Sequence, residues 1–257
     1  MEEKERLGSC QKVLIGLGEE WKFRREMEDS KKKGRLCEAY QALYELVRDR
    51  DYFIITMATD GLIYETPLGS RQETVIPAEA AKEEIFPGED MDAGMLAKME
   101  QIFPKREIAR DTRWERIVAP CGNETWRQCS LACTKDIWEP GEIADDRCPH
   151  CGAPLTGNTV EAQPYIEEGY LMQWERYTRW LAQTLNQDTA ILELGVGFQN
   201  PGVIRFPFEK AAYFNSKAYL VRVNKNFPQI AGELAGRAKG IREDSVAWMI
   251  AERRHLW

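Results

Sequence analysis

Four cysteines in two close pairs constrain this chain more than any other feature. Three residues separate Cys129 from Cys133, two separate Cys148 from Cys151, and fourteen lie between the pairs. Each pair is short enough for both sulfurs to reach one ion from a tight turn, and four thiolates suit tetrahedral zinc. Because four sulfurs leave no position for water, the spacing predicts a structural zinc-ribbon module at about residues 120–156. The alternative is two pairs of unligated thiols.

Charge and apolar patterning indicate the cellular compartment of the protein and the kinds of partner it can bind. The first ten residues lack the basic and apolar regions of a secretion signal, and no apolar run approaches the roughly 18 residues of a membrane helix. We therefore expect a cytoplasmic protein with reduced cysteines and no membrane contact. Asp and Glu number 42 against 35 Lys and Arg, a net charge of −7, which argues against a nucleic-acid partner.

Apolar runs alternate with helix-compatible stretches towards both ends of the chain. The predicted strands are 12–17, 52–58, 114–119, 189–194 and 218–223, and the predicted helices are 19–33, 36–47, 165–185, 203–214 and 242–253. This order predicts an α/β fold with a Rossmann-like, doubly wound parallel sheet, in which ligands bind at the carboxyl ends of the strands.

One long segment interrupts the alternation. Residues 66–159 are predicted to be an insertion, irregular and partly helical around 92–103, that also carries the zinc module, whereas 1–65 and 160–257 form the Rossmann-like domain. Within helix 165–185 a stripe of apolar residues is predicted to pack on the sheet. Its members are Tyr170, Leu171, Trp174, Tyr177, Trp180, Leu181 and Leu185.

Several motifs resemble those of the sirtuins. Residues 56–62 (TMATDGL) resemble the sirtuin pattern TQNIDGL, and Cys121-Gly122 stands where sirtuins have His-Gly before the zinc cysteines. Residues 195–197 (GVG) resemble Gly-Thr-Ser, and Val223-Asn224 resembles Ile-Asn. The longer run 192–208, with LELGVG, NPG and RFPF, is similar to the macrodomain-linked (class M) sirtuins of bacteria.

The resemblance implies an NAD-dependent protein ADP-ribosyltransferase that releases nicotinamide and modifies a protein acceptor. It also implies a structural Zn²⁺, a lipoyl-carrier-like acceptor and a macrodomain partner. The alternatives are a catalytically degenerate protein that binds NAD or ADP-ribose, an NAD-dependent deacylase, and a zinc-stabilised scaffold without a nucleotide.

The resemblance also assigns roles to individual residues. Asp60 and Cys121 take the catalytic positions, and the dinucleotide-binding residues are Gly16, Gly18, Thr56, Asp60, Gly195, Val196, Gly197, Asn224 and Ile241. The glycines would approach the phosphates, Asp60 the nicotinamide carboxamide, Asn224 the adenosine ribose and Ile241 the adenine. A turn-capping role for Asp60 remains open on the residues alone.

The chain departs from the sirtuin pattern where chemistry is expected. Cys121 replaces the histidine base, and a thiol is mostly neutral at pH 7, so ordinary deacylation is disfavoured. Ala58 replaces an asparagine and cannot form a hydrogen bond, while Glu19 and Glu20 put negative charge near a phosphate position. With His150 expected to face solvent, the other candidates for acid, base or phosphate partner are Glu65, Arg113, Glu124 and Arg205.

Overall fold

A six-stranded parallel sheet forms the centre of the molecule. The computed structural model describes residues 9–23, 30–70, 73–76, 107–110 and 113–252. The strand order is β11-β10-β9-β1-β2-β5, and every neighbouring pair is parallel. The strands are β1 (Lys12–Leu17), β2 (Asp51–Thr56), β5 (Ile117–Val118), β9 (Thr189–Leu194), β10 (Ala218–Val223) and β11 (Ala238–Ile241). A parallel sheet covered on both faces is the predicted doubly wound architecture.

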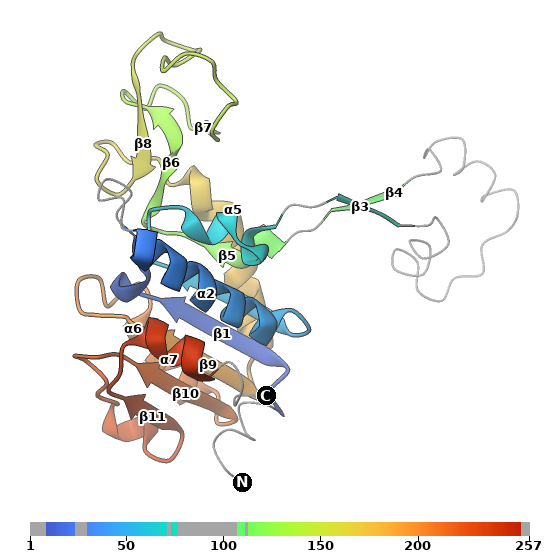
Figure 1. Cartoon of the computed structure of the whole chain (residues 1–257), viewed down its shortest axis with the longest axis vertical. Helices are drawn as coiled ribbons and strands as arrows, with labels where there is room; N and C mark the ends of the chain where they lie inside the picture. The colour runs from blue at the N-terminus through green and yellow to red at the C-terminus, as the bar shows by residue number, and fades with distance from the viewer. Residues whose placement is uncertain (1–8, 24–29, 71–72, 77–106, 111–112, 253–257) are drawn as a thin grey trace, which may run out of the picture.

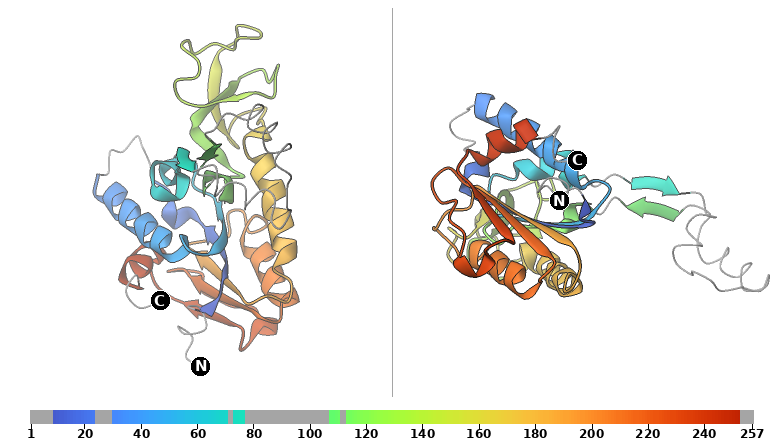
Figure 2. Two further views of the ribbon diagram at one scale, coloured as in Figure 1. Left: turned by 90° about the vertical axis from the view of Figure 1, so that its right-hand side faces the viewer. Right: turned by 90° about the horizontal axis from the view of Figure 1, so that it is seen from below.

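Helices cover both faces of this sheet (Figures 1 and 2). Helices α2 (Ser30–Val47) and α7 (Ser245–Glu252) pack on one face, around Tyr40 and Trp21. Helices α5 (Glu168–Gln183) and α6 (Arg205–Phe214) pack on the other, where Phe208 is fully buried. Successive side chains of a strand point to opposite faces, so the apolar strands supply both cores. None of the helices in the described ranges is long and apolar enough to cross a membrane.

The strand order reverses between β1 and β9. From β1 the chain runs outward to β2 and β5, and from β9 it runs the other way to β10 and β11. The connections therefore leave the carboxyl ends of β1 and β9 in opposite directions; this is the switch point, where doubly wound sheets in general form a ligand crevice. The backbone N–H of Gly18 donates to the carbonyl of Leu194 at 2.9 Å across this point.

The cysteine module extends from one end of the main domain (Figure 1). Its antiparallel sheet has the order β7-β6-β8, with β6 at Gly122–Cys129, β7 at Ile137–Trp138 and β8 at Leu155–Thr159. A separate antiparallel pair joins β3 (Glu73–Ile76) to β4 (Glu107–Arg110). Short 3-10 turns complete the described chain: η1 (Glu19–Trp21), η3 (Leu62–Glu65), η4 (Pro67–Gly69), η5 (Arg113–Arg116) and η6 (Gly232–Leu234).

The predictions for strands 12–17, 189–194 and 218–223 are confirmed. The helix expected at 19–33 is wrong in its first part, because Gly18 leads only into η1 and α2 begins at Ser30. Here the carboxylates of Glu19 and Glu20 bind backbone N–H groups of distant segments instead of a helix of their own. The helix predicted at 92–103 lies outside the described residues.

Two further expectations need correction. Residues 114–119 divide into η5 and the short strand β5, and β5 forms the edge of the main sheet although it falls within the predicted insertion 66–159. On α5, Leu171 and Leu185 are exposed, whereas Tyr177 and Trp180 are buried. Leu171 lies nine residues before Trp180, which is two and a half turns and hence the opposite face, and Leu185 lies beyond the end of the helix.

Candidate functional site

Two glycine-containing turns meet at the crevice between β1 and β9. A Cβ on Gly18 would lie 2.3 Å from the carbonyl oxygen of Gly195, so only glycine allows this approach. Gly195 has φ +66°, a left-handed conformation that favours glycine. A Cβ on Gly16 would lie 2.4 Å from a side-chain atom of Ile204, so Gly16 allows the tight packing beside α6. The structure thus brings the predicted glycines together at the switch point.

Glu19 and Glu20 reach across this crevice to different partners. Gly197 N–H donates to Glu19 Oε2 at 2.8 Å, while Glu19 Oε1 is buried and has no hydrogen-bond partner. Glu20 Oε2 accepts from the backbone N–H of Ser245 at 2.8 Å and from its hydroxyl at 2.6 Å. Glu20 therefore binds the first residue of α7. Of these two glutamates, Glu19 is the one with an oxygen that no described residue donates to, at the predicted dinucleotide position. A ribose hydroxyl supplies such a donor, and a phosphate does not.

Asn224 organises the loop on the far side of the crevice. Its side-chain nitrogen donates to Val196 O at 2.9 Å, and its oxygen accepts from the N–H groups of Asn226 and Phe227, each at 2.8 Å. Its backbone N–H donates to Ile241 O at 3.0 Å. Three residues that sequence analysis assigned to the dinucleotide, Asn224, Val196 and Ile241, are thus adjacent, and their contacts with a ligand remain predictions.

Asp60 follows β2 and is completely buried. Its two carboxylate oxygens accept backbone N–H groups, one from Phe23 and one from Leu62, each at 2.8 Å. The turn-capping role that the sequence left open is therefore present, and the expected contact with nicotinamide remains a prediction. Thr56 is also buried, and its hydroxyl accepts the N–H of Ala58 at 3.1 Å, which shapes the same turn.

Cys121, at the position of the sirtuin histidine, is buried. Burial raises the pKa of its thiol, the charge of Lys22 lowers it in part, and the charge of Glu19 raises it further. The thiol is therefore neutral at physiological pH and a poor base. Three residues along, Glu124 Oε1 accepts the Thr59 hydroxyl at 2.5 Å and lies 3.6 Å from Lys22 Nζ.

The four predicted metal ligands gather at the tip of the cysteine module. Their sulfurs lie within 4.8 Å of one another, with Cys129 and Cys148 buried and Cys133 and Cys151 exposed. The backbone N–H of Cys133 lowers the pKa of Cys129 to about 6, which favours the thiolate that a metal binds. Four sulfurs at these distances are a ligand set that suits a tetrahedral zinc ion.

His150 lies outside this set of sulfurs. It is exposed, and its Nε2 is 2.8 Å from Asp136 Oδ2. The prediction that His150 faces solvent is confirmed.

A buried ionic cluster lies beneath the crevice, and the sequence did not reveal it. Glu193, at 0% exposure, forms a bidentate pair with Arg222, with distances of 2.7 Å to Nε and 2.8 Å to Nη2. Burial would lower the pKa of Arg222, but Glu193 and Glu209 raise it; burial raises the pKa of Glu193, and Arg222 and Arg205 oppose that rise. The two short hydrogen bonds fit a pair in which both groups are charged. Such a cluster has no sequence signal, because a charged residue within an apolar strand normally predicts an exposed face.

Arg205 belongs to the same cluster and is bound to protein groups, and its suggested role as acid, base or phosphate partner stays a prediction. It is 3% exposed, lies 3.4 Å from Glu193, and donates to the carbonyls of Phe227 and Gln229 at 3.2 Å. Its guanidinium lies 4.3 Å from the ring centre of Phe198. Arg205 therefore holds the loop after β10 against the turn after β9. Of the other candidates, the side chain of Arg113 lies outside the described part.

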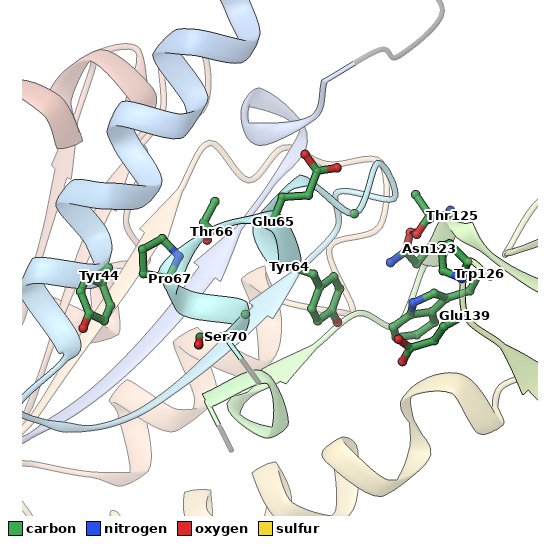
Figure 3. Close-up of a pocket in the computed structure, with 13 residues that line it drawn as sticks. Tyr44, Tyr64, Glu65, Thr66, Pro67, Ser70, Asn123, Thr125, Trp126 and Glu139 are labelled. Atoms are coloured by element: carbon green, nitrogen blue, oxygen red, sulfur yellow. Dashed lines mark hydrogen bonds between the residues drawn. The ribbon is translucent and has the colours of Figure 1, made fainter. Parts of the chain in front are cut away.

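A cavity of about 930 Å³ lies between η3, η4 and the beginning of β6. Figure 3 shows Tyr64 and Trp126 side by side in its wall, with Glu139 next to them; the two rings are 5.5 Å apart. Glu65 also lines it and pairs with Lys33 at 3.2 Å. Because its walls come from segments far apart in the chain, no local motif could predict the cavity.

Comparison with known proteins gives two findings. No family model matches the chain. A protein ADP-ribosyltransferase of Staphylococcus aureus (strain Mu50 / ATCC 700699) is 28% identical over 131 residues, which are 48% of this chain and 41% of that protein. The chain thus spans less than half the length of this relative. A solved structure of a Sir2 enzyme, studied for mechanism and regulation, matches with TM-score 0.50 and 14% identity, over 100% of this chain and 99% of that one.

These findings define the class of protein through its fold. The chain has the fold of the Sir2 enzymes, with a parallel six-stranded sheet and a four-cysteine cluster in a small second module. The predicted fold and the sirtuin resemblance are confirmed at this level. In sequence, the chain is similar to the staphylococcal protein ADP-ribosyltransferase. The macrodomain-linked class stays a prediction.

Proposed function

We propose that this protein is a sirtuin-like, NAD-dependent protein ADP-ribosyltransferase that releases nicotinamide and transfers ADP-ribose to a protein acceptor. The observation that carries the proposal is the meeting of two glycine turns at the switch point, beside the buried Glu19 Oε1, to which no described residue donates a hydrogen bond. A buried acceptor of this kind is costly unless a ligand donates to it. Similarity to a protein named for ADP-ribosyl transfer gives independent support.

Different residues of the chain would contact different parts of the dinucleotide. Glu19 would accept a hydroxyl of a ribose, and the turn at 195–197 would lie under the phosphates. Asp60 fixes the turn after β2 through its two backbone hydrogen bonds, so that this edge of the crevice is rigid before the dinucleotide arrives. NAD supplies the activated bond between ribose and nicotinamide, and the fold supplies orientation and exclusion of water.

The four thiolates are proposed to hold zinc. A closed sulfur site stabilises a small module that buries little apolar surface of its own, and it offers no open position for catalysis. The metal would thus fix β6, whose residue Asn123 lines the cavity beside Tyr64, without entering the chemistry.

The acceptor and setting are also proposals. We infer a protein acceptor, with a lipoyl-carrier-like protein as the first candidate and a macrodomain protein as a functional partner. We also infer a cytoplasmic, bacterial setting.

A second candidate is a protein that binds NAD or ADP-ribose without turnover. The neutral, buried thiol of Cys121 and the methyl group of Ala58 favour it, because neither takes part in proton transfer at pH 7. The same thiol disfavours the deacylase alternative, which needs a base at that position.

The test uses the purified full chain, NAD labelled in its adenylate group, and a lipoylated carrier protein as acceptor. Labelled carrier together with free nicotinamide is the expected result. The variant Glu19→Gln should weaken NAD binding about tenfold, while Glu161→Gln, an exposed glutamate, leaves it unchanged. Tight NAD binding with no nicotinamide release would favour the second candidate, and no binding at all would refute both.

A further inference from the structure

Glu124 shares a neighbour with Cys121, which stands at the position of the sirtuin histidine: the charge of Lys22 acts on the Cys121 thiol, and Lys22 Nζ lies 3.6 Å from Glu124 Oε1. We propose that Glu124 is the catalytic base that takes the proton from the nucleophile attacking the ribose. This inference rests on the proposed function and adds to it the group that makes transfer feasible without a histidine. It begins from geometry: Glu124 follows Cys121 by three residues, at the start of β6.

Two separate segments, at Thr59 and at Lys22, hold Glu124 in place. The backbone N–H of Glu124 donates to Thr59 O at 2.7 Å, and the Thr59 hydroxyl donates to Glu124 Oε1 at 2.5 Å. Lys22 Nζ, from the segment after η1, lies 3.6 Å from the same oxygen. Thr59 follows β2 and Lys22 follows β1, so both partners lie beyond the carboxyl ends of two neighbouring strands of the main sheet. The carboxylate is thus oriented by one oxygen only.

The second oxygen of Glu124 is available for chemistry. Among the residues that the structure describes, Oε2 receives no hydrogen bond, and the side chain is 40% exposed. A base needs this combination, because one oxygen must be fixed while the other keeps lone pairs open to the incoming proton.

Neighbouring groups are less suited to this role. Both oxygens of Asp60 accept backbone N–H groups. Glu19 also has one oxygen without a donor, but that oxygen is buried and is the one proposed to accept the ribose hydroxyl. The Cys121 thiol is neutral, because burial raises its pKa. His150 lies in the cysteine module, paired with Asp136. Glu124 combines a fixed carboxylate with an open oxygen at this edge of the sheet.

The proposed step balances without any further reagent. The heteroatom of the nucleophile bonds to the anomeric carbon of the ribose, and its proton passes to Glu124 Oε2. The bond from that carbon to nicotinamide breaks, and its electron pair leaves with nicotinamide, whose ring becomes neutral. Thr59 and Lys22 act as positioning residues through Oε1.

The experiment compares nucleophiles that do and do not carry a proton. Wild type and the Glu124→Ala variant are incubated with NAD in water, in dilute methanol, and with sodium azide. We expect Glu124→Ala to cleave NAD about 10²- to 10⁴-fold more slowly with water or methanol, because both must lose a proton. Azide has no proton to lose, so it should restore cleavage and give ADP-ribosyl azide.

Controls separate this role from folding and from binding. Glu161→Ala, an exposed glutamate, should match wild type. Glu124→Gln keeps the size of the side chain, and calorimetry should show NAD affinity within about twofold of wild type, since the proposal gives Glu124 no part in holding the dinucleotide.

Each other outcome overturns the proposal. If Glu124→Ala cleaves NAD at the wild-type rate in water, Glu124 is not the base. The same conclusion follows if the variant cleaves NAD slowly and azide does not restore the rate. A Glu124→Gln variant that no longer binds NAD would show a binding role instead. If wild type cleaves NAD with none of the three nucleophiles and also fails to label the carrier protein, the proposed function itself fails. If wild type labels the carrier alone, carrier labelling becomes the readout, and a wild-type rate in Glu124→Ala refutes the base.

Discussion

The buried pair of Glu193 and Arg222 offers the sharpest test of how the crevice is supported. Both side chains are at 0% exposure, and two hydrogen bonds of 2.7 and 2.8 Å join them. The variant Arg222→Met removes the cation and leaves Glu193 with Arg205, at 3.4 Å, as its remaining ionic partner. Breaking a buried pair in this way costs about 3–5 kcal/mol, because the charge left behind has lost its compensation.

The double variant Glu193→Met/Arg222→Met separates that charge from the contacts of Arg222. It removes both charges and fills the space with apolar groups, which is close to neutral for buried pairs in other proteins. The carbonyl of Gln229 loses one of its two donors and keeps Arg205 at 3.2 Å, while Arg205 loses its buried partner Glu193; together these losses cost about 1–3 kcal/mol. We therefore expect the double variant to be about 1–3 kcal/mol less stable than wild type, and more stable than Arg222→Met.

Urea denaturation measures these differences. At a slope of about 3 kcal/mol per molar urea, the midpoint of Arg222→Met should fall by about 1–1.7 M. Arg179→Met, which breaks an exposed pair with Glu175 at 3.4 Å, should change stability by no more than about 0.5 kcal/mol. A cost below about 1 kcal/mol for Arg222→Met, or a double variant clearly less stable than the single one, would refute the reasoning.

Three further predictions follow from the turns and the thiols. Gly195→Ala should lower the free energy of unfolding by about 1–3 kcal/mol, because φ is +66° and the new Cβ would lie 2.5 Å from Glu20 Cβ. Gly34→Ala, in α2 with no atom within 4 Å of its methyl group, should raise the free energy of unfolding by about 0.5–1 kcal/mol, and chemical denaturation measures both changes. Metal analysis of the purified protein should find about one zinc ion per chain and a clear loss in Cys148→Ser; equal metal in both would contradict the thiolate site. Iodoacetamide should alkylate Cys121 slowly at pH 7, with a rate that still rises above pH 9, because its raised pKa delays thiolate formation; peptide mass spectrometry that finds rapid labelling at pH 7 would contradict this.

Local patterns predicted the parts of the fold that local forces decide. Strands such as 12–17 and 189–194 are continuous apolar runs ended by glycine, so their bounds could be read from the residues. The spacing of the four cysteines likewise predicted their gathering, because two short turns can each present two sulfurs to one point.

The parts that failed depend on contacts between distant segments. A run of charged residues after Gly18 suggested a helix, but Glu19 and Glu20 bond to Gly197 and Ser245, more than 170 residues away. Arg205 was a candidate phosphate partner, because no local pattern reveals that it lies beside the buried Glu193. Glu124 was one candidate among four, and only the folded chain brings Thr59 to it.

The central claim is that the crevice between β1 and β9 binds the dinucleotide, and hydrogen exchange tests it most directly. Backbone exchange is followed with and without saturating NAD. The account predicts slower exchange at residues 16–20 and 194–198 and around Asn224, where the two turns meet. Protection confined to the walls of the Tyr64 and Trp126 cavity, with no change at the glycine turns, would contradict it.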